Sequence, residues 1–538
     1  MDLAEQLRIL EEAQRDPARL ALATIDIAHG NLPAAEREEL KDALAAAAVP
    51  HWVDADFLAA LLGCPRERAA GLAMQLRHLN VIERFPARGE DALNVHEASR
   101  KALRKQLRTE QRDRFARLSA RAHEFVGGAT AFHLRIERLY HLFAFDMDAA
   151  AAECGRLDHD ASAVESPESW AALARLLSEL LAENWLTGRA FLEATLSVNE
   201  CRMASNESAG VRESAEAALK LATDLGEDRL AARARILLGD LLRLRGDLEG
   251  ALRAFENSEE LMRRYTARFP DDPGLQRELS ASINRLGDIY ALQQQFTEAS
   301  EIYRRSFEIA SASAERYPDD VGCQRQLSIT HSRLGDVLSE NKLWYDALAE
   351  YKQSLAIAER LTQESPQHSG WQRVLGVAHS RLGDVFVALE RFDDAISAFK
   401  KNFDIAENLA ALEPNNMLAQ RELAVARTKF ADMLARNGRS EEALGDYYES
   451  LEAHKALVAH DPTNADWQRE LGLALFSIGH ALAALNRRDE ALKYLHAAEA
   501  QSRSAVAMAP GIAEWRRDIE LTRSWITELE GAADDAPG

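Results

Sequence analysis

The chain has 538 residues, of which 47% are hydrophobic and 28% are charged, and its formal net charge at pH 7 is −22. This length exceeds what one hydrophobic core usually holds, so we expect several domains or a repeat array. The hydrophobic content excludes a disordered chain. The acidic balance disfavours non-specific binding to nucleic acid.

The cysteines and the first residues indicate the environment of the protein. Four cysteines are widely separated in the sequence: Cys64, Cys154, Cys201 and Cys323. Because zinc sites use closely spaced ligands and disulfide scaffolds are rich in cysteine, we expect neither, and no cofactor. No run of 18 apolar residues predicts a transmembrane helix, and the start lacks the pattern of a secretory signal. We therefore expect a cytoplasmic protein without a membrane partner.

Residues 1–46 are predicted to form a short helical segment, and the pattern changes at residue 47. Two helical sequences, VDADFLAALLG and PRERAAGLAMQLRHLN, precede two strand-like sequences, VIERFP and ALNVHE. A long helix is expected from about Ser99. This order is typical of a winged helix. Residues 47–125 resemble the winged-helix module of STAND-type signalling ATPases, which lies between a nucleotide-binding domain and a repeat sensor.

The sequence departs from STAND ATPases in the residues that bind nucleotide. Their P-loop, GxxxxGK[ST], surrounds phosphates with backbone amides and a lysine, and this sequence contains no Gly-Lys pair. No other motif of catalytic residues stands out. We therefore expect the regulatory and sensor part of such a protein, and no enzymatic activity.

The expected long helix is rich in basic residues: Arg100, Lys101, Arg104, Lys105, Arg108 and Arg112. Such a cluster suits either DNA phosphates or an acidic protein surface. In winged helices the second helix usually reads the bases, and its sequence here carries few basic residues. The pattern therefore favours a docking surface, with nucleic acid as the less favoured partner.

Residues 126–228 are predicted to be a helical bridge of degenerate hairpins. Within it, His133, Glu137 and His141 recur every four residues on one helical face. This spacing suits a metal site, but it more often marks a partly buried polar stripe. We expect the polar stripe and no metal.

Residues 229–530 contain six units with a period of 48 residues. A small residue opens the pattern in each unit: Gly239, Gly287, Gly335, Gly383, Ala431 and Gly479. An alanine follows twelve residues later, and a large residue four after that: Phe255, Tyr303, Tyr351, Phe399, Tyr447 and Leu495. A proline ends each unit, from Pro270 to Pro510, because proline cannot continue a helix. We infer a helical hairpin whose small residues lie where its two helices touch, with the aromatic ring between neighbouring hairpins.

These residues resemble the tetratricopeptide (TPR) motif in the spacing of glycine, alanine and aromatic residue. The usual TPR unit has about 34 residues, and the additional residues here add nearly two turns to each helix. The resemblance implies an all-α fold, a right-handed α-solenoid of TPR-type hairpins. A single helix is expected to cap the array after the sixth unit, followed by a disordered tail at 531–538.

A column of acidic residues follows the repeat glycine. The resemblance implies that it lies on the first helix of each hairpin, on the concave face. With the short polar residue one turn earlier, the predicted groove consists of Asn284, Asp288, Ser332, Asp336, Ser380, Asp384, Thr428 and Asp432. The column either binds a basic or amide-rich peptide, or forms a ladder with Arg285, Arg333, Arg381 and Lys429, three residues earlier. The arginines of the Gln-Arg pairs that open most units are a further set of cations that can reach these acids.

Together, these patterns favour a non-enzymatic scaffold or sensor that binds a protein or peptide, and the STAND resemblance suggests bacterial signalling or defence. The alternative is a transcription regulator whose winged helix binds DNA and whose TPR array senses a ligand.

The missing P-loop gives a direct test. The purified chain is expected neither to bind ATP specifically nor to hydrolyse it, because no Gly-Lys pair is present to hold the phosphates. Equilibrium binding with labelled ATP and a phosphate-release assay measure both. Saturable, magnesium-dependent turnover by a homogeneous preparation would contradict the expectation.

Overall fold

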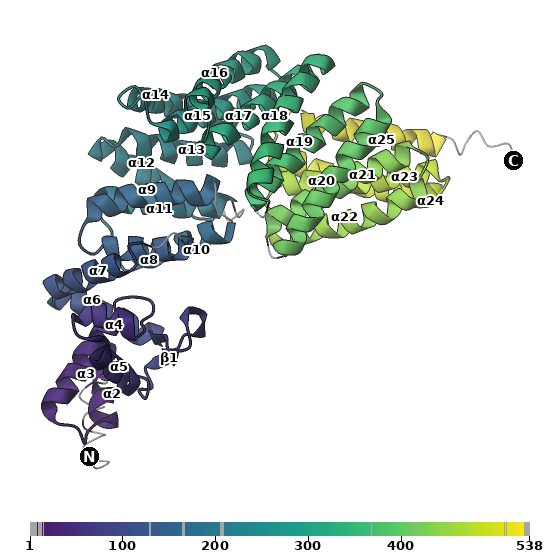
Figure 1. Ribbon diagram of the computed structural model, residues 1–538. Coiled ribbons are helices and arrows are strands. Elements are labelled where there is room, and N and C mark those ends of the chain that lie inside the picture. Colours follow the sequence, from purple (N-terminus) through teal and green to yellow (C-terminus); the bar gives the residue numbers. More distant parts are fainter. Residues whose placement is uncertain are drawn as a thin grey trace. The chain divides into compact units, whose positions relative to one another are not determined.

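The computed structural model describes Arg8, Ala13 and residues 16–128, 131–163, 167–204, 209–366, 368–414, 416–510, 512 and 514–531. Within these residues there are 24 α-helices, one 3-10 turn and one two-stranded sheet (Figure 1). Contacts divide the chain into two units. The N-terminal unit is Met1–His159 with Ala171–Ala194, and the array unit is Asp160–Trp170 with Thr195–Gly538.

The first described elements of the N-terminal unit are short helices and a β-hairpin. They are α2 Pro17–Ala28, α3 Ala34–Ala47, α4 Ala55–Leu62, α5 Arg66–Leu76, β1 Ile82–Arg84, η1 Pro86–Arg88 and β2 Leu93–Val95. The strands are antiparallel, with Glu83 opposite Asn94, and lie within the two predicted strand sequences. Phe57, Leu61 and Leu76 are fully buried in the core of this unit. No comparison identifies this segment as a winged helix, so that assignment stays a prediction.

Seven further helices connect this segment to the regular array. They are α6 Glu97–Glu110, α7 Arg112–Phe125, α8 Phe132–Leu142, α9 Met147–Ala163, α10 Pro167–Ala182, α11 Gly188–Ala204 and α12 Val211–Leu225. The helical character predicted for residues 126–228 is present in the described part of that range.

The prediction of one long basic helix is wrong, because the segment forms two helices, α6 and α7. Gln111 separates them, with φ −133° and ψ 50°, outside the helical region. The two halves pack against different partners: α6 against α2, and α7 against α4 and α8. Tertiary packing therefore sets the break, which the hydrophobic spacing of the segment does not reveal.

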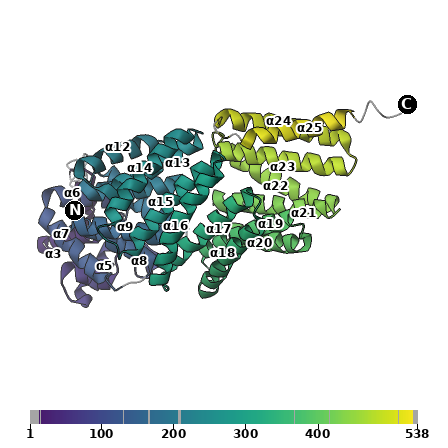
Figure 2. The ribbon, with the colours of Figure 1, turned by 90° about the horizontal axis from the view of Figure 1, so that it is seen from above.

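Six helical hairpins follow, each a first helix and a second helix joined by a short turn (Figure 2). The helices are α13 Asp228–Leu244, α14 Leu248–Thr266, α15 Pro273–Leu292, α16 Phe296–Arg316, α17 Val321–Glu340, α18 Trp344–Glu364, α19 Ser369–Ala388, α20 Phe392–Leu412, α21 Met417–Arg436, α22 Ser440–His460, α23 Ala465–Ala484 and α24 Arg488–Met508. Each second helix packs against the first helix of the next hairpin. The predicted all-α solenoid is confirmed.

Capping side chains and turns set the helix ends with the same 48-residue period. Asp272, Asp320, Asn416 and Asn464 each accept a hydrogen bond from a backbone N–H in the first turn of a first helix. Each of these caps follows a proline by two residues. The turn inside each hairpin contains one residue with positive φ: Gly246, Gln294, Lys342, Glu390, Gly438 and Asn486. Four of these six are not glycine, so the hairpin imposes the left-handed conformation on ordinary residues.

The two helices of a hairpin meet where an aromatic ring lies directly on the repeat glycine. A Cβ atom on Gly287 would lie 2.4 Å from Tyr303 Cε1, and one on Gly335 would lie 2.5 Å from Tyr351 Cε1. Such distances leave no room for a methyl group. The ring also reaches the following hairpin, because Tyr303 clusters with Val337. The aromatic residue therefore packs between hairpins as predicted, and within its own hairpin as well.

A single helix, α25 Glu514–Gly531, follows the sixth hairpin and packs against α23 and α24. Trp515 and Ile526 are buried. This is the predicted C-terminal helix. Of the predicted tail at 531–538, Gly531 is the last residue of this helix, and residues 532–538 lie outside the described residues. Among the described helices, none has both the length and the hydropathy needed to cross a bilayer.

The glycine–ring contact predicts a large effect of one methyl group. Gly287→Ala is expected to destabilise the array by about 1–3 kcal/mol, because Tyr303 must move away. The matched control is Gly445→Ala in α22, where an added Cβ has nothing within 4 Å. That change is expected to stabilise the helix by up to about 1 kcal/mol. Thermal and urea unfolding measure both, and equal effects of the two substitutions would contradict the close contact.

Candidate functional site

The predicted acidic column lies on the first helices, where the tyrosines of the second helices reach it. Tyrosine hydroxyls donate to the acids in three hairpins: Tyr303 to Asp288 at 2.6 Å, Tyr351 to Asp336 at 2.8 Å and Tyr447 to Asp432 at 2.5 Å. Burial, followed by the charge of the neighbouring carboxylate, raises the pKa of all three tyrosines, which keeps them protonated as donors.

Each of the first four acids also binds a cation from the next hairpin, a set that we call the aspartate ladder. Its ion pairs are Arg285 Nε–Asp240 Oδ2 at 3.4 Å, Arg333 Nη2–Asp288 Oδ2 at 3.1 Å, Arg381 Nε–Asp336 Oδ1 at 2.9 Å and Lys429 Nζ–Asp384 Oδ2 at 2.6 Å. The acids in these pairs are 25–42% exposed, so the ladder lies half-buried along the first-helix face.

The partners in the ladder differ from the expected ones. The sequence spacing predicts pairs three residues apart within one helix, and among the described residues of the column one such pair, Arg333–Asp336, lies within 4.0 Å. The shorter pairs join neighbouring hairpins, because equivalent positions of adjacent first helices lie side by side in the stack. The arginines that open the units behave in the same way. They form a second set of inter-hairpin pairs: Arg229–Glu278, Arg373–Glu422, Arg421–Glu470 and Arg469–Asp518.

The short polar residues of the predicted groove are bound to other parts of the array. Ser332 and Thr428 share hydrogen bonds with serines of their second helices: Ser332 with Ser354 at 2.9 Å, and Thr428 with Ser450 at 2.7 Å. Asn284 is buried and donates to Thr330 at 3.5 Å, and Ser380 accepts from Lys429 at 3.0 Å. These side chains therefore face the packed hairpins more than an open groove.

Two features of this face were not recognised from the sequence, although both follow the 48-residue period. The first is a column of buried serines on the second helices: Ser258, Ser306, Ser354 and Ser450. The second is an apolar stripe on the first helices, two turns before the acids: Ile329, Val377, Val425 and Leu473. Val377 is 49% exposed and Leu473 is 36% exposed, so the stripe offers apolar surface to a partner.

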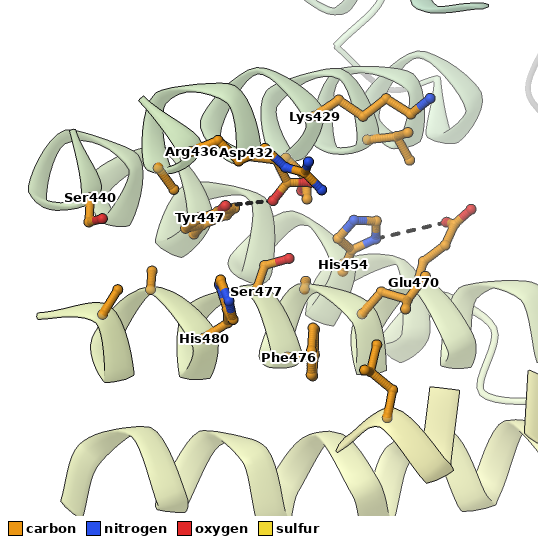
Figure 3. Close-up of a pocket in the computed structure, with 18 of the residues that line it drawn as sticks. Lys429, Asp432, Arg436, Ser440, Tyr447, His454, Glu470, Phe476, Ser477 and His480 are labelled. Atoms are coloured by element: carbon orange, nitrogen blue, oxygen red, sulfur yellow. Dashed lines mark hydrogen bonds and ion pairs between the residues drawn. The ribbon is translucent and has the colours of Figure 1, made fainter. Parts of the chain in front are cut away.

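The aspartate ladder stops at the fifth hairpin. Asp432 is present, but the position that should supply its cation is Ser477, 48 residues after Lys429. A pocket of about 650 Å³ lies there, which we call the end pocket. It is formed by α21, α22, α23 and α25, and its lining includes Asp432, Arg436, Tyr447, His454, Glu470, Phe476, Ser477, His480, Leu521 and Trp525 (Figure 3).

The ionisable groups of the end pocket are strongly perturbed. Burial raises the pKa of Asp432, although the Tyr447 hydrogen bond and the charges of Arg436 and Lys429 act in the opposite direction. Burial, and then the charge of Arg421, lowers the pKa of His454 to about 4. Burial also lowers the pKa of His480. Both histidines are therefore neutral at pH 7, in a site that combines the carboxylates of Asp432 and Glu470 with aromatic walls.

The predicted basic docking surface is divided in two. Arg104 is 2% exposed, donates to the carbonyl oxygens of Ala48 and Val49, and lies 3.6 Å from Glu179. Its guanidinium also lies over the ring of Tyr140. Two other members point inward as well, since Arg100 is 8% exposed and Arg108 binds Glu183 at 3.3 Å.

The prediction that all six basic residues form one docking surface is therefore wrong. The remaining three side chains lie at the surface: Lys101, Lys105 and Arg112. Lys101 pairs with Glu97. Three arginines spaced four residues apart form the inner face of α6, where they serve the packing of the N-terminal unit.

The polar stripe on α8 is partly buried, as expected. His133 is exposed, whereas Glu137 and His141 are buried and lie 3.3 Å apart. His51, from outside the helix, binds Glu137 at 2.7 Å. Among the described residues, no group of histidine, cysteine and carboxylate side chains is arranged to hold a metal ion.

Comparison with known proteins agrees with this architecture. Residues 279–312, which cover most of α15 and α16, match the family model of the tetratricopeptide repeat. The array consists of tetratricopeptide repeats. A search of curated proteins finds no match to the chain.

Among solved structures, a STAND protein with a TPR sensor from Pyrococcus horikoshii matches 97% of this chain and 71% of its own, with TM-score 0.56 and 12% identity. A Rap protein in complex with Competence and Sporulation Factor matches 76% of this chain and 99% of its own, with TM-score 0.40 and 13% identity. Aspartyl phosphate phosphatase F of Bacillus subtilis matches 74% and 94%, with TM-score 0.36 and 15% identity. The expected likeness to a STAND protein with a TPR sensor is thus confirmed for the fold.

From these ion pairs we predict that the acids of the aspartate ladder stabilise the array. Asp336→Asn is expected to lower the free energy of unfolding by about 1–3 kcal/mol, because Tyr351 and Arg381 then lose their charged, half-buried acceptor. The control is Asp346→Asn on the exposed start of α18, for which a few tenths of a kcal/mol is expected. Thermal unfolding of both variants decides the point, and an unchanged midpoint for Asp336→Asn would contradict a structural ladder.

Proposed function

We propose that the chain is a non-catalytic sensor or scaffold that binds a protein or peptide partner on the first-helix face of its TPR array. The finer assignment, a cytoplasmic role in bacterial signalling or defence, is part of this proposal. The observation that carries it is the end pocket on that face. Its volume of about 650 Å³ lies within the range of ligand sites, and its aromatic lining and perturbed carboxylate are typical of such sites.

The exposed apolar stripe supports the same face. Val377 and Leu473 occupy equivalent positions on α19 and α23, and both side chains are open to solvent. A solenoid presents several equivalent helices to one extended partner, so a stripe of this kind gives repeated apolar contacts. Along the first four ladder steps the carboxylates already bind the chain's own cations. The groove predicted from the acidic column there stays a prediction, and we place the main contacts at the stripe and the end pocket.

The transcription-regulator alternative draws less support. Three of the six basic residues proposed for docking point into the protein, and the exposed remainder is a small positive surface for DNA phosphates.

The partner-binding face is tested by affinity capture followed by mass spectrometry. The double variant Val377→Glu with Leu473→Glu is expected to lose the specific partner recovered by the wild type, because charges replace the apolar contacts. Its melting temperature is expected to change little, since both side chains are exposed.

The matched control is Leu412→Glu at the end of α20, where the side chain is 69% exposed but lies on a second helix. Equal recovery of the partner by the wild type and the double variant would place binding elsewhere. Absence of any specific partner of the wild type would contradict the function itself.

A further inference from the structure

The four complete steps of the aspartate ladder serve as an internal template for the fifth. In each complete step a cation from the first helix of the next hairpin forms an ion pair with the carboxylate. At the fifth step Asp432 has the same tyrosine contact as Asp288 and Asp336, so its carboxylate is held in the same manner. By the 48-residue period, the cation that pairs with Asp432 would be at position 477, but the chain has Ser477 there.

The space that this cation would occupy is open. The end pocket contains both Asp432 and Ser477 in its lining, and Figure 3 shows the serine opposite the carboxylate. In the complete step before it, Lys429 fills the equivalent place and binds both Asp384 and Ser380. Lys429 therefore makes its ion pair with the acid of the fourth step, although it also lines the end pocket and its charge acts on Asp432.

The other cations near Asp432 do not take the place of the absent one. Arg436 lies one turn further along α21, and its side chain is exposed. Within the described residues, no ion pair shorter than 4.0 Å joins it to Asp432. Arg469 binds Asp518 at 2.8 Å. Asp432 therefore accepts hydrogen bonds from the hydroxyls of Tyr447 and Ser477, but it lacks the ion pair with a cation of the next first helix that its four counterparts have.

The walls of the end pocket suit a flat cation. His480 and Trp525 pack edge to face with centroids 4.6 Å apart, and Phe476 stacks beside His480. Aromatic faces attract a guanidinium group, which also matches a carboxylate through its fork of N–H donors. Because burial lowers the pKa of His454 and His480, neither adds a positive charge that would repel such a group at pH 7.

We propose that the end pocket binds an arginine side chain of the partner, whose guanidinium binds Asp432 where the ladder's own arginine is replaced by Ser477. This inference rests on the proposed function and names the chemistry of the partner: a peptide segment or protein loop with an exposed arginine. The partner's arginine thereby supplies the cation of the fifth step, in the pocket that α25 also lines.

The test uses the full chain and two short probes, the acetylated tripeptide amide glycyl-arginyl-glycine and its analogue with citrulline, which is neutral but nearly the same shape. Calorimetry or ligand-observed NMR is expected to show saturable binding of the arginine peptide, and binding of the citrulline peptide about tenfold weaker or more. Asp432→Asn is expected to remove this preference. The control Asp346→Asn is expected to keep it.

Ser477→Arg supplies the absent cation from the chain itself. It is expected to abolish binding of the arginine peptide and to raise the melting temperature, which keeps the test decisive if Asp432→Asn fails to fold. Equal affinity for the two peptides, or unchanged binding by the folded Asp432→Asn or Ser477→Arg variants, would overturn the inference. A natural partner still captured by Ser477→Arg would overturn it too, while the proposed function would stand. Loss of that partner supports both.

Discussion

The close contact between a glycine on one helix and an aromatic ring on the next recurs in the first four hairpins of the array. With no Cβ at Gly287, the Tyr303 ring lies on the backbone of α15, and the two helices approach closely. That approach carries the tyrosine hydroxyl to Asp288. The acid, held in this way, then receives Arg333 from the following hairpin. In this hairpin the absent side chain thus allows the close helix approach that places the tyrosine hydroxyl beside the ion pair between hairpins.

The pattern changes at three positions on α21 and α23, the first helices of the fifth and sixth hairpins. Alanine replaces the glycine at Ala431, serine replaces the base at Ser477, and histidine replaces the next acid at His480. Ser477 and His480 line the end pocket, and Ala431 precedes Asp432, which also lines it. Real proteins break local rules most often at functional sites. Two departures from the repeat that line the same pocket support a site there more strongly than the pocket alone.

The sequence predicted features whose cause is local. The period of 48, the paired helices and the proline-marked ends follow from residues that act on their own backbone, and all of them appear in the structure. The break at Gln111 was missed because it results from packing α6 and α7 against different helices. The burial of Arg104 was missed because its partners, the carbonyls of Ala48 and Val49, are more than fifty residues away.

The candidate site was only partly foreseen for the same reason. The column of acids could be read directly, but the spacing suggested partners three residues away, whereas the cations come from the next hairpin. The sequence did contain the decisive signal, because aligning the units places Ser477 beneath Lys429 and Arg381. The serine can be recognised as a missing cation only when the ion pairs of the equivalent residues, Arg381 and Lys429, are known from the structure.

The central claim is that the ladder links neighbouring hairpins, and a double-mutant cycle on Arg333 and Asp288 tests it most directly. The unfolding free energies of Arg333→Met, Asp288→Asn and the double variant give the coupling between two side chains in different repeats. The structure predicts a coupling of about 1–3 kcal/mol, since the pair is half-buried and shared with Tyr303. A coupling indistinguishable from zero would contradict the ladder.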